Sequence, residues 1–199
     1  LPDGTLVWLN AGSRITYSQG FGVGNRKIEL IGEGYFEVKR NEEVPFLVKT
    51  NSLLVKVLGT KFNFRDYPDD AEAIVSLSEG KVALNNLLKK EKEAFLLPNE
   101  RVVLNKKNGR MHVEYSTVSN ALQWTNGYLF FDEELLPDVV KELERSYNVK
   151  IQIASDTLNT FRFYGNFVHR EQNIQEVLEA LSATRKIHYI IEGHNITLY

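Results

Sequence analysis

Residues 53–65, LLVKVLGTKFNFR, constrain the fold of this chain more than any other stretch. From Leu53 onward the apolar side chains fall on odd numbers, but beyond Gly59 they fall on even numbers, at Phe62 and Phe64. Each half has the two-residue period of a strand with one buried face. A strand whose buried face switches parity needs an extra residue, and a glycine accommodates it at least cost. The pattern predicts one long strand that bends at Gly59 and serves two layers of a β-rich core.

The rest of residues 1–118 consists of short apolar alternations separated by turn signals. Such signals recur about every ten residues, for example at Pro2-Asp3-Gly4, Gly32-Glu33-Gly34 and Asn108-Gly109. Glycine accepts the left-handed backbone that these turns need, and Asn-Gly is a strong hairpin signal. No segment in this part has the period of a helix. Residues 1–118 are therefore predicted to form an all-β sandwich or a stack of hairpins.

The remaining residues, 119–199, contain an internal repeat. At an offset of 38 residues, Gly127 aligns with Gly165, and Val140 aligns with Leu178. Each unit has the pattern strand, helix, strand. Two βαβ units predict a small α+β domain, with both helices on one face of one sheet and with Val140 and Leu178 buried.

Two local patterns locate the helices of this repeat. Apolar residues from Leu136 to Tyr147 recur at helical spacing and form one stripe. Asn173 and Glu176 have the spacing of an N-cap and its capping box, which predicts the start of the second helix.

Composition excludes several classes of function. A net charge of −2 and a pI near 6.1 argue against nucleic acid as a partner. The absence of cysteine excludes a disulfide scaffold and a thiolate metal site. No apolar run approaches the roughly 20 residues of a membrane helix. Because the chain begins at Leu1 with neither an initiator methionine nor a signal peptide, it resembles a piece of a longer chain whose anchor or signal could lie upstream.

No group of residues predicts catalysis, a cofactor or a metal. His188 and His194 flank a predicted hairpin, but two imidazoles without a third ligand are a weak metal signal. Asp132-Glu133-Glu134 precedes the first predicted helix, where the helix dipole favours negative charge, so a capping role explains it. We therefore expect no enzyme activity.

Five segments resemble, in order and spacing, the periplasmic domain of FecR-type transmembrane anti-sigma regulators. They are LPDGTLVWLNAGS (1–13), ELIGEGYFEV (29–38), PFLVKT (45–50), VKVLGTKFNFRDYPDD (55–70) and LSEGKV (77–82). Residues 124–199 look like the C-terminal domain of the same proteins in Bacteroidetes, which is similar to the short secretin/TonB N-terminal domain. The resemblance implies a FecR-like β domain at 1–118 and this α+β domain at 119–199.

The resemblance also implies a role in signalling without catalysis. FecR-like proteins cross the inner membrane once and sense a TonB-dependent outer-membrane transducer from the periplasm. They hold an extracytoplasmic-function sigma factor through a cytoplasmic segment, which this sequence does not contain. The expected partners are thus the periplasmic signalling domain of a transducer and, through that other segment, a sigma factor.

The last strand predicts a docking surface. Asn195, Thr197 and Tyr199 would point outward from it, and none of them is charged. A terminal strand can lie at a sheet edge, where free N–H and C=O groups invite strand addition from a partner. The alternative is an inner strand, or an edge that the β domain covers.

Two other functions compete with signalling. A carbohydrate-binding β-module of an envelope protein would gather exposed tryptophan and tyrosine on one concave face, whereas Trp8 and Trp124 lie within apolar patterns. A hydrolase would need an acid–base or nucleophile set that the sequence lacks.

Overall fold

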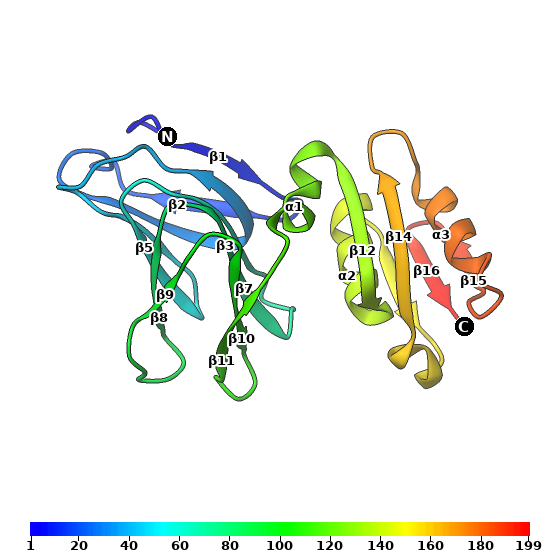
Figure 1. Ribbon diagram of the computed structural model, residues 1–199. Helices are drawn as coiled ribbons and strands as arrows, with labels where there is room; N and C mark the ends of the chain where they lie inside the picture. The colour runs from blue at the N-terminus through cyan, green and yellow to red at the C-terminus, as the bar shows by residue number, and fades with distance from the viewer. The chain divides into compact units, whose positions relative to one another are not determined.

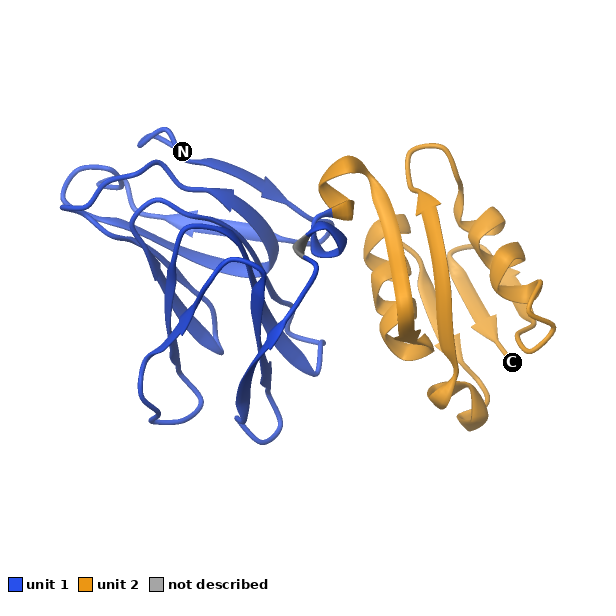
Figure 2. Cartoon of the chain, viewed as in Figure 1, with its two compact units in different colours: residues 1–122 blue, residues 123–199 orange. Residues whose placement is uncertain are grey.

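A strand of 12 residues, β3 (Arg26–Glu37), organises the N-terminal half of the computed structural model, which describes residues 1–117 and 119–199 (Figure 1). The chain separates into two units, Leu1–Leu122 and Gln123–Tyr199 (Figure 2). The sequence places this boundary four residues earlier, at 118/119. The short helix α1 (Val118–Ala121) contacts β7 (Glu72–Glu79) and so lies with the first unit.

The first unit is an all-β structure that ends in α1. Its other strands are β1 (Leu6–Leu9), β2 (Arg14–Tyr17), β4 (Phe46–Lys49), β5 (Leu53–Val57), β6 (Lys61–Asp66), β8 (Val82–Asn86), β9 (Ala94–Leu96), β10 (Glu100–Asn105) and β11 (Met111–Tyr115).

The two halves of β3 have different neighbours. The first half pairs with β2 and, in parallel, with β4, and the second half pairs with β1 and β6. The strand order is β11-β10-β7-β6-β3-β4-β5-β8-β9, with β1 and β2 attached to β3. Side chains from both halves of this sheet meet in one hydrophobic core. The predicted β-rich architecture is confirmed.

The stretch 53–65 links the two halves of the sheet, as its change of parity predicts. All five of its core-facing apolar side chains are at most 2% exposed: Leu53, Val55, Val57, Phe62 and Phe64. The prediction of one continuous strand is wrong, because β5 ends at Val57 and β6 begins at Lys61. The carbonyls of Leu58 and Thr60 instead accept hydrogen bonds from the N–H groups of Asn41 and Val38.

The turn predicted at Gly32-Glu33-Gly34 is also wrong, since β3 continues through it. Gly32 has φ +96° and lies so close to Ser13 that a Cβ would collide with that side chain. A left-handed glycine can bend a strand without ending it. This bend is where β3 passes from one half of the sheet to the other.

The second unit contains two small sheets and two α-helices. Its elements are η1 (Gln123–Asn126), β12 (Tyr128–Leu135), α2 (Leu136–Tyr147), β13 (Lys150–Ile153), η2 (Asp156–Thr160), β14 (Arg162–Val168), α3 (Ile174–Ser182), β15 (Tyr189–Glu192) and β16 (Asn195–Leu198). No helix in the parts of the chain that the structure describes has both the length and the apolar character needed to cross a membrane.

The strand–helix–strand order of both repeats is confirmed, but the single shared sheet is not. The first strands of the two repeats, β12 and β14, pair with each other in one sheet. Leu129 pairs with Phe167, its own equivalent at the 38-residue offset, so the two repeats are related by an approximate two-fold axis. The closing strands, β13 and β15, lie in a second sheet on either side of β16.

The predicted core of the duplicated unit is confirmed. Val140 is 6% exposed and Leu178 is fully buried. The second helix begins after Asn173, whose side chain accepts from the N–H of Glu176, while the Glu176 carboxylate accepts from the N–H of Asn173. Local sequence therefore predicts both helices, although it does not predict how the strands pair.

The close approach at Gly59 can be tested by adding a methyl group. A Cβ there would lie 2.7–2.8 Å from the Cβ and Cα of Arg40, closer than real contacts allow. We expect Gly59→Ala to lower the free energy of unfolding by about 1–3 kcal/mol, because the 38–41 segment must move away. Denaturant unfolding measures the change. Gly20→Ala is the control, since its nearest neighbour lies 3.9 Å away; equal midpoints for the two variants would contradict this prediction.

Candidate partner-binding site

The strand that carries Asn195, Thr197 and Tyr199 is not an edge strand. β16 lies between β13, to which it is parallel, and β15, to which it is antiparallel. Tyr199 also exchanges two backbone hydrogen bonds with His188, of 2.8 and 3.0 Å. Because both sides of β16 already have neighbours, the expected strand addition at these residues is wrong.

Their side chains remain available to a partner. Asn195 and Tyr199 are exposed and Thr197 is half-buried, while Ile196 and Leu198 between them face the core. The predicted alternation is therefore correct although the predicted edge is not. A contact through these three side chains stays a prediction.

A buried polar cluster gathers residues from the motifs of the first unit. The carboxylate of Glu33, which is 4% exposed, accepts hydrogen bonds from the side-chain amides of Asn63 (2.7 Å) and Asn10 (2.9 Å). The guanidinium of Arg65 lies 3.6 Å from Glu33 and donates to Asp70 at 2.8 Å. A buried carboxylate is tolerated only with such partners. Its role here is to hold the loop after β1 against β3 and β6.

Hydroxyl groups continue this cluster. Ser13 Oγ accepts from the N–H of Glu33 at 2.8 Å and donates to the Tyr67 hydroxyl at 3.1 Å. Tyr67 in turn donates to the carbonyl of Ala11 at 2.8 Å. Each of these hydroxyls donates to another group of the protein, so this serine is held as a structural residue rather than presented as a nucleophile. Sequence analysis missed the cluster because its members look like ordinary turn and strand residues.

A second buried ion pair fixes the start of the chain. Arg26 Nη1 lies 3.3 Å from Asp3 Oδ2, and both side chains are buried. The same guanidinium donates to the backbone carbonyls of Val44, Lys39 and Asn41. The Pro2-Asp3-Gly4 turn is thereby attached to the loop that joins β3 to β4.

The acidic run 132–134 does not cap a helix. These residues belong to β12, where the register with β14 shifts between Phe131 and Glu134, and Glu133 has φ +55°. The residue at the N-cap of α2 is Leu135, and Asp138 supplies the acidic side chain of the first turn. The helix-dipole interpretation of this run is therefore wrong. A hydrogen bond to Glu133 raises the pKa of the exposed Tyr164.

Trp8 is not embedded in the core, contrary to the sequence-based interpretation. It lies on β1 with 39% of its surface exposed, and its ring centroid is 5.5 Å from that of Tyr35. Burial, and then the nearby Glu37, raise the pKa of Tyr35 to about 12. The other exposed aromatic side chains of this unit belong to different segments, which include Tyr17 on β2, Phe95 on β9 and Tyr115 on β11. In the described part of the chain, no ring contact joins two of these exposed side chains.

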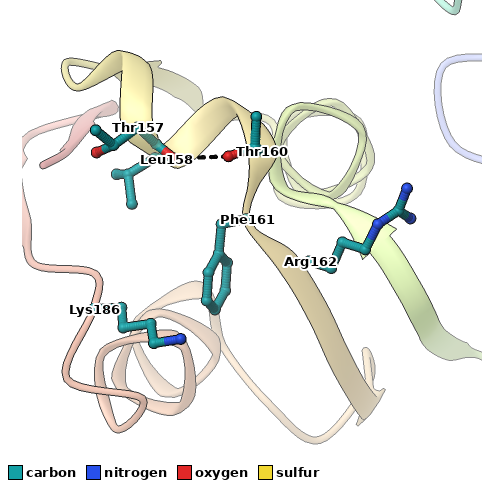
Figure 3. A pocket seen from close by; sticks show the side chains of 6 residues that line it. All are labelled: Thr157, Leu158, Thr160, Phe161, Arg162 and Lys186. Carbon is teal, nitrogen blue, oxygen red and sulfur yellow. Dashed lines mark hydrogen bonds between the residues drawn. The ribbon is translucent and has the colours of Figure 1, made fainter.

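The second unit has an open depression of about 500 Å³ beside η2 (Figure 3). Phe161 and Lys186 point toward each other across it, with the Lys186 ammonium 5.6 Å from the ring centroid. Arg162 contributes only its stem, since its guanidinium points away and donates to the carbonyl of Glu133 at 2.6 Å. Thr157, Leu158 and Thr160 complete the lining. The depression offers an aromatic ring and one cation, which suits an anionic side chain.

Histidine and acidic side chains do not assemble a metal site in the described part of the chain, where no three of them are grouped. The ring of His188 lies 5.8 Å from that of Tyr199.

Comparison with known proteins gives matches to both units. The family model described as "FecR protein" matches residues 1–83, and the model "FecR, C-terminal" matches residues 128–198. No curated protein matches the chain. Two crystal structures of a candidate anti-sigma factor from Parabacteroides distasonis ATCC 8503, at 1.65 and 2.50 Å resolution, each superpose with a TM-score of 0.89 and 35% sequence identity. These matches cover 100% of this chain and 92% and 91% of the solved chains.

The buried carboxylate can be tested by removing its charge. In Glu33→Gln, an NH₂ group replaces one of the two carboxylate oxygens that accept from Asn10 and Asn63, so two donors oppose each other. The attraction between the carboxylate and Arg65 is also lost. We expect a loss of about 1–3 kcal/mol in the free energy of unfolding. Glu29→Gln, an exposed change on the same strand 4.0 Å from Lys49, should change it by less than about 0.5 kcal/mol. Similar losses in both variants would show that the cluster does not stabilise the fold.

The raised pKa of Tyr35 predicts a loss of stability at alkaline pH. The folded state keeps this phenol neutral up to about pH 12, whereas the unfolded chain releases its proton near the ordinary tyrosine pKa of 10.0. The contribution of the neutral Tyr35 phenol to the free energy of unfolding is therefore complete below pH 10 and is lost as the pH rises through 12. In unfolding titrations from pH 9 to 12, Tyr35→Phe should lose stability less steeply than the wild type. The exposed Tyr115→Phe should keep the wild-type slope; a wild-type slope in Tyr35→Phe would contradict the assignment.

Proposed function

The chain belongs to the FecR family, and we propose that it is the periplasmic sensor region of a FecR-type anti-sigma regulator. In this proposal it binds the signalling domain of a TonB-dependent outer-membrane transducer and so controls an extracytoplasmic-function sigma factor. Contact with the sigma factor is assigned to a cytoplasmic segment outside these residues. The periplasmic location and the single membrane anchor belong to the same proposal.

One observation carries the proposal. The two family models match both units in order, and the whole chain superposes on a candidate anti-sigma factor at 35% identity. A likeness over every residue of the chain supports the two units as one functional region of a regulator. Regulators of this kind act through protein partners.

The chemistry of the described residues is compatible with a binding role. The most elaborate polar cluster, around Glu33, is buried and serves to attach a loop to the sheet. The exposed features are instead short edge strands with apolar side chains, such as Leu6, Trp8 and Leu9 on β1 and Ile190 and Ile191 on β15. Edge strands recognise other proteins by adding a strand to a sheet.

A direct binding experiment tests the proposal. We expect the purified chain to bind one signalling domain from a panel of TonB-dependent transducers of the same genome, saturably and with a 1:1 stoichiometry in calorimetry. Transducers that lack such a domain provide the matched negative control. If every signalling domain in the panel fails to bind while the chain remains folded, the proposed partner class is wrong.

A further inference from the structure

The strand β15 is an open edge of the three-stranded sheet. Among the described strands it pairs with β16 alone. The backbone hydrogen bonds between His188 and Tyr199 show which residues of this segment direct their N–H and C=O groups toward β16. In an antiparallel pair, alternate residues direct their backbone groups toward the neighbour. Residues 188, 190 and 192 therefore face β16, and the N–H and C=O groups of Tyr189 and Ile191 point to the free edge.

The opposite edge of this sheet, β13, is blocked. Its residues 150 and 154 donate to β16, which leaves the N–H of Ile151 pointing outward, and the carboxylate of Glu144 accepts that N–H at 2.9 Å. At the 38-residue offset, Ile151 corresponds to Tyr189 and Glu144 corresponds to Ser182. A serine side chain is too short to make the same bond. The two repeats therefore place equivalent strands, β13 and β15, at the two edges of the sheet. Only β13 has a side chain, that of Glu144, that occupies an outward N–H group.

The side chains of β15 add to this asymmetry. Ile190 is 50% exposed and Ile191 is 41% exposed, whereas β13 presents Lys150 and Gln152 to solvent. Proteins usually protect edge strands with charges, prolines or bulges. β15 has only Glu192, at its far end. An exposed apolar edge without protection is the arrangement that strand addition requires.

We propose that β15 binds an extended segment of the partner protein as an added antiparallel strand, with a carboxylate side chain near the end of that segment beside Lys186. This inference rests on the proposed function and names the surface through which the partner binds. The added strand would accept and donate hydrogen bonds at Tyr189 and Ile191. The added strand would also cover Ile191. This side chain is on the same face of the sheet as the buried Ile196, but it lies at the edge and is partly exposed.

The positive charges near the start of β15 indicate that the added segment carries an acidic side chain. Arg185 and Lys186 lie between α3 and β15, and Ile187 and His188 separate them from Tyr189, the first residue of β15. Among the described residues, neither side chain forms an ion pair with a carboxylate. Lys186 also lines the depression beside Phe161 in Figure 3. An antiparallel segment has its C-terminal end at the start of β15, so that end is the one nearer in the chain to these cations. A carboxylate there meets opposite charge, and a lysine there meets like charge.

Synthetic peptides test the surface independently of the natural partner. The probes are a capped peptide of alternating threonine and valine that ends in two glutamates, and the same peptide ending in two lysines. Titrated into the full ¹⁵N-labelled chain, the glutamate peptide should shift the amide signals of Tyr189 and Ile191. It should bind roughly tenfold more tightly than the lysine peptide. Shifts centred on β13 or β1, equal affinities, or no saturable binding would each overturn the proposal.

A pair of matched variants tests the backbone contact. Ile191→Pro removes an outward N–H without deleting a bond between β15 and β16, and should weaken the glutamate peptide about five- to tenfold. Its repeat equivalent Ile153→Pro, at the blocked edge, should leave the affinity unchanged. Thermal melts establish that both variants are folded. If Ile191→Pro unfolds, Ile191→Lys serves instead, because it keeps every backbone donor and places a charge on the edge.

Three further outcomes are decisive. Self-association of the chain that Ile191→Lys abolishes would assign the edge to a second copy and overturn the proposed occupant. If a transducer domain binds wild type and Ile191→Pro equally, the β15 surface is wrong but the proposed function stands. If the glutamate peptide binds as expected and no transducer domain binds, the surface stands and the partner class is wrong.

Discussion

The architecture of the first unit depends on a carboxylate held away from water. Glu33 lies directly after the left-handed Gly32, at the point where β3 passes from one half of the sheet to the other. Burial of an unpaired carboxylate would cost several kcal/mol. Its position is therefore tolerated only when Asn10 arrives from the β1–β2 loop and Asn63 and Arg65 arrive from β6. This requirement couples the β1–β2 loop, β3 and β6 into one arrangement.

In the second unit, the corresponding constraint is the insertion of β16. Two copies of strand–helix–strand are related by an approximate two-fold axis through the pair Leu129–Phe167. The last strand has no equivalent in the first repeat, and it separates β13 from β15. A duplicated fold thereby acquires two unequal edges, one closed by Glu144 and one open. An asymmetric surface for a partner can arise in this way without any catalytic group.

The errors of sequence-based prediction share one cause. Gly32-Glu33-Gly34 carries a turn signal, but strand β3 continues through it. The sequence predicts that Gly59 bends one continuous strand, but Gly59 lies between β5 and β6 and packs against Arg40. Asp132-Glu133-Glu134 precedes a helix in sequence, yet a bulge in β12 places it outside the first turn. The local sequence predicts which backbone conformations a residue can adopt. The local sequence does not predict which distant segment that residue will contact.

The sequence alone determined the β-rich first unit, the parity of the 53–65 stretch, the two helices of the repeat, the capping box at Asn173 and the family resemblance. These depend on interactions within a few residues, such as alternating burial and side-chain capping. Only the tertiary structure decided that β16 is an inner strand, that β12 pairs with β14, and that Glu33 is the centre of a buried cluster. Strand partners and buried ion pairs join segments far apart in the chain, and a single sequence carries no local signal for such choices.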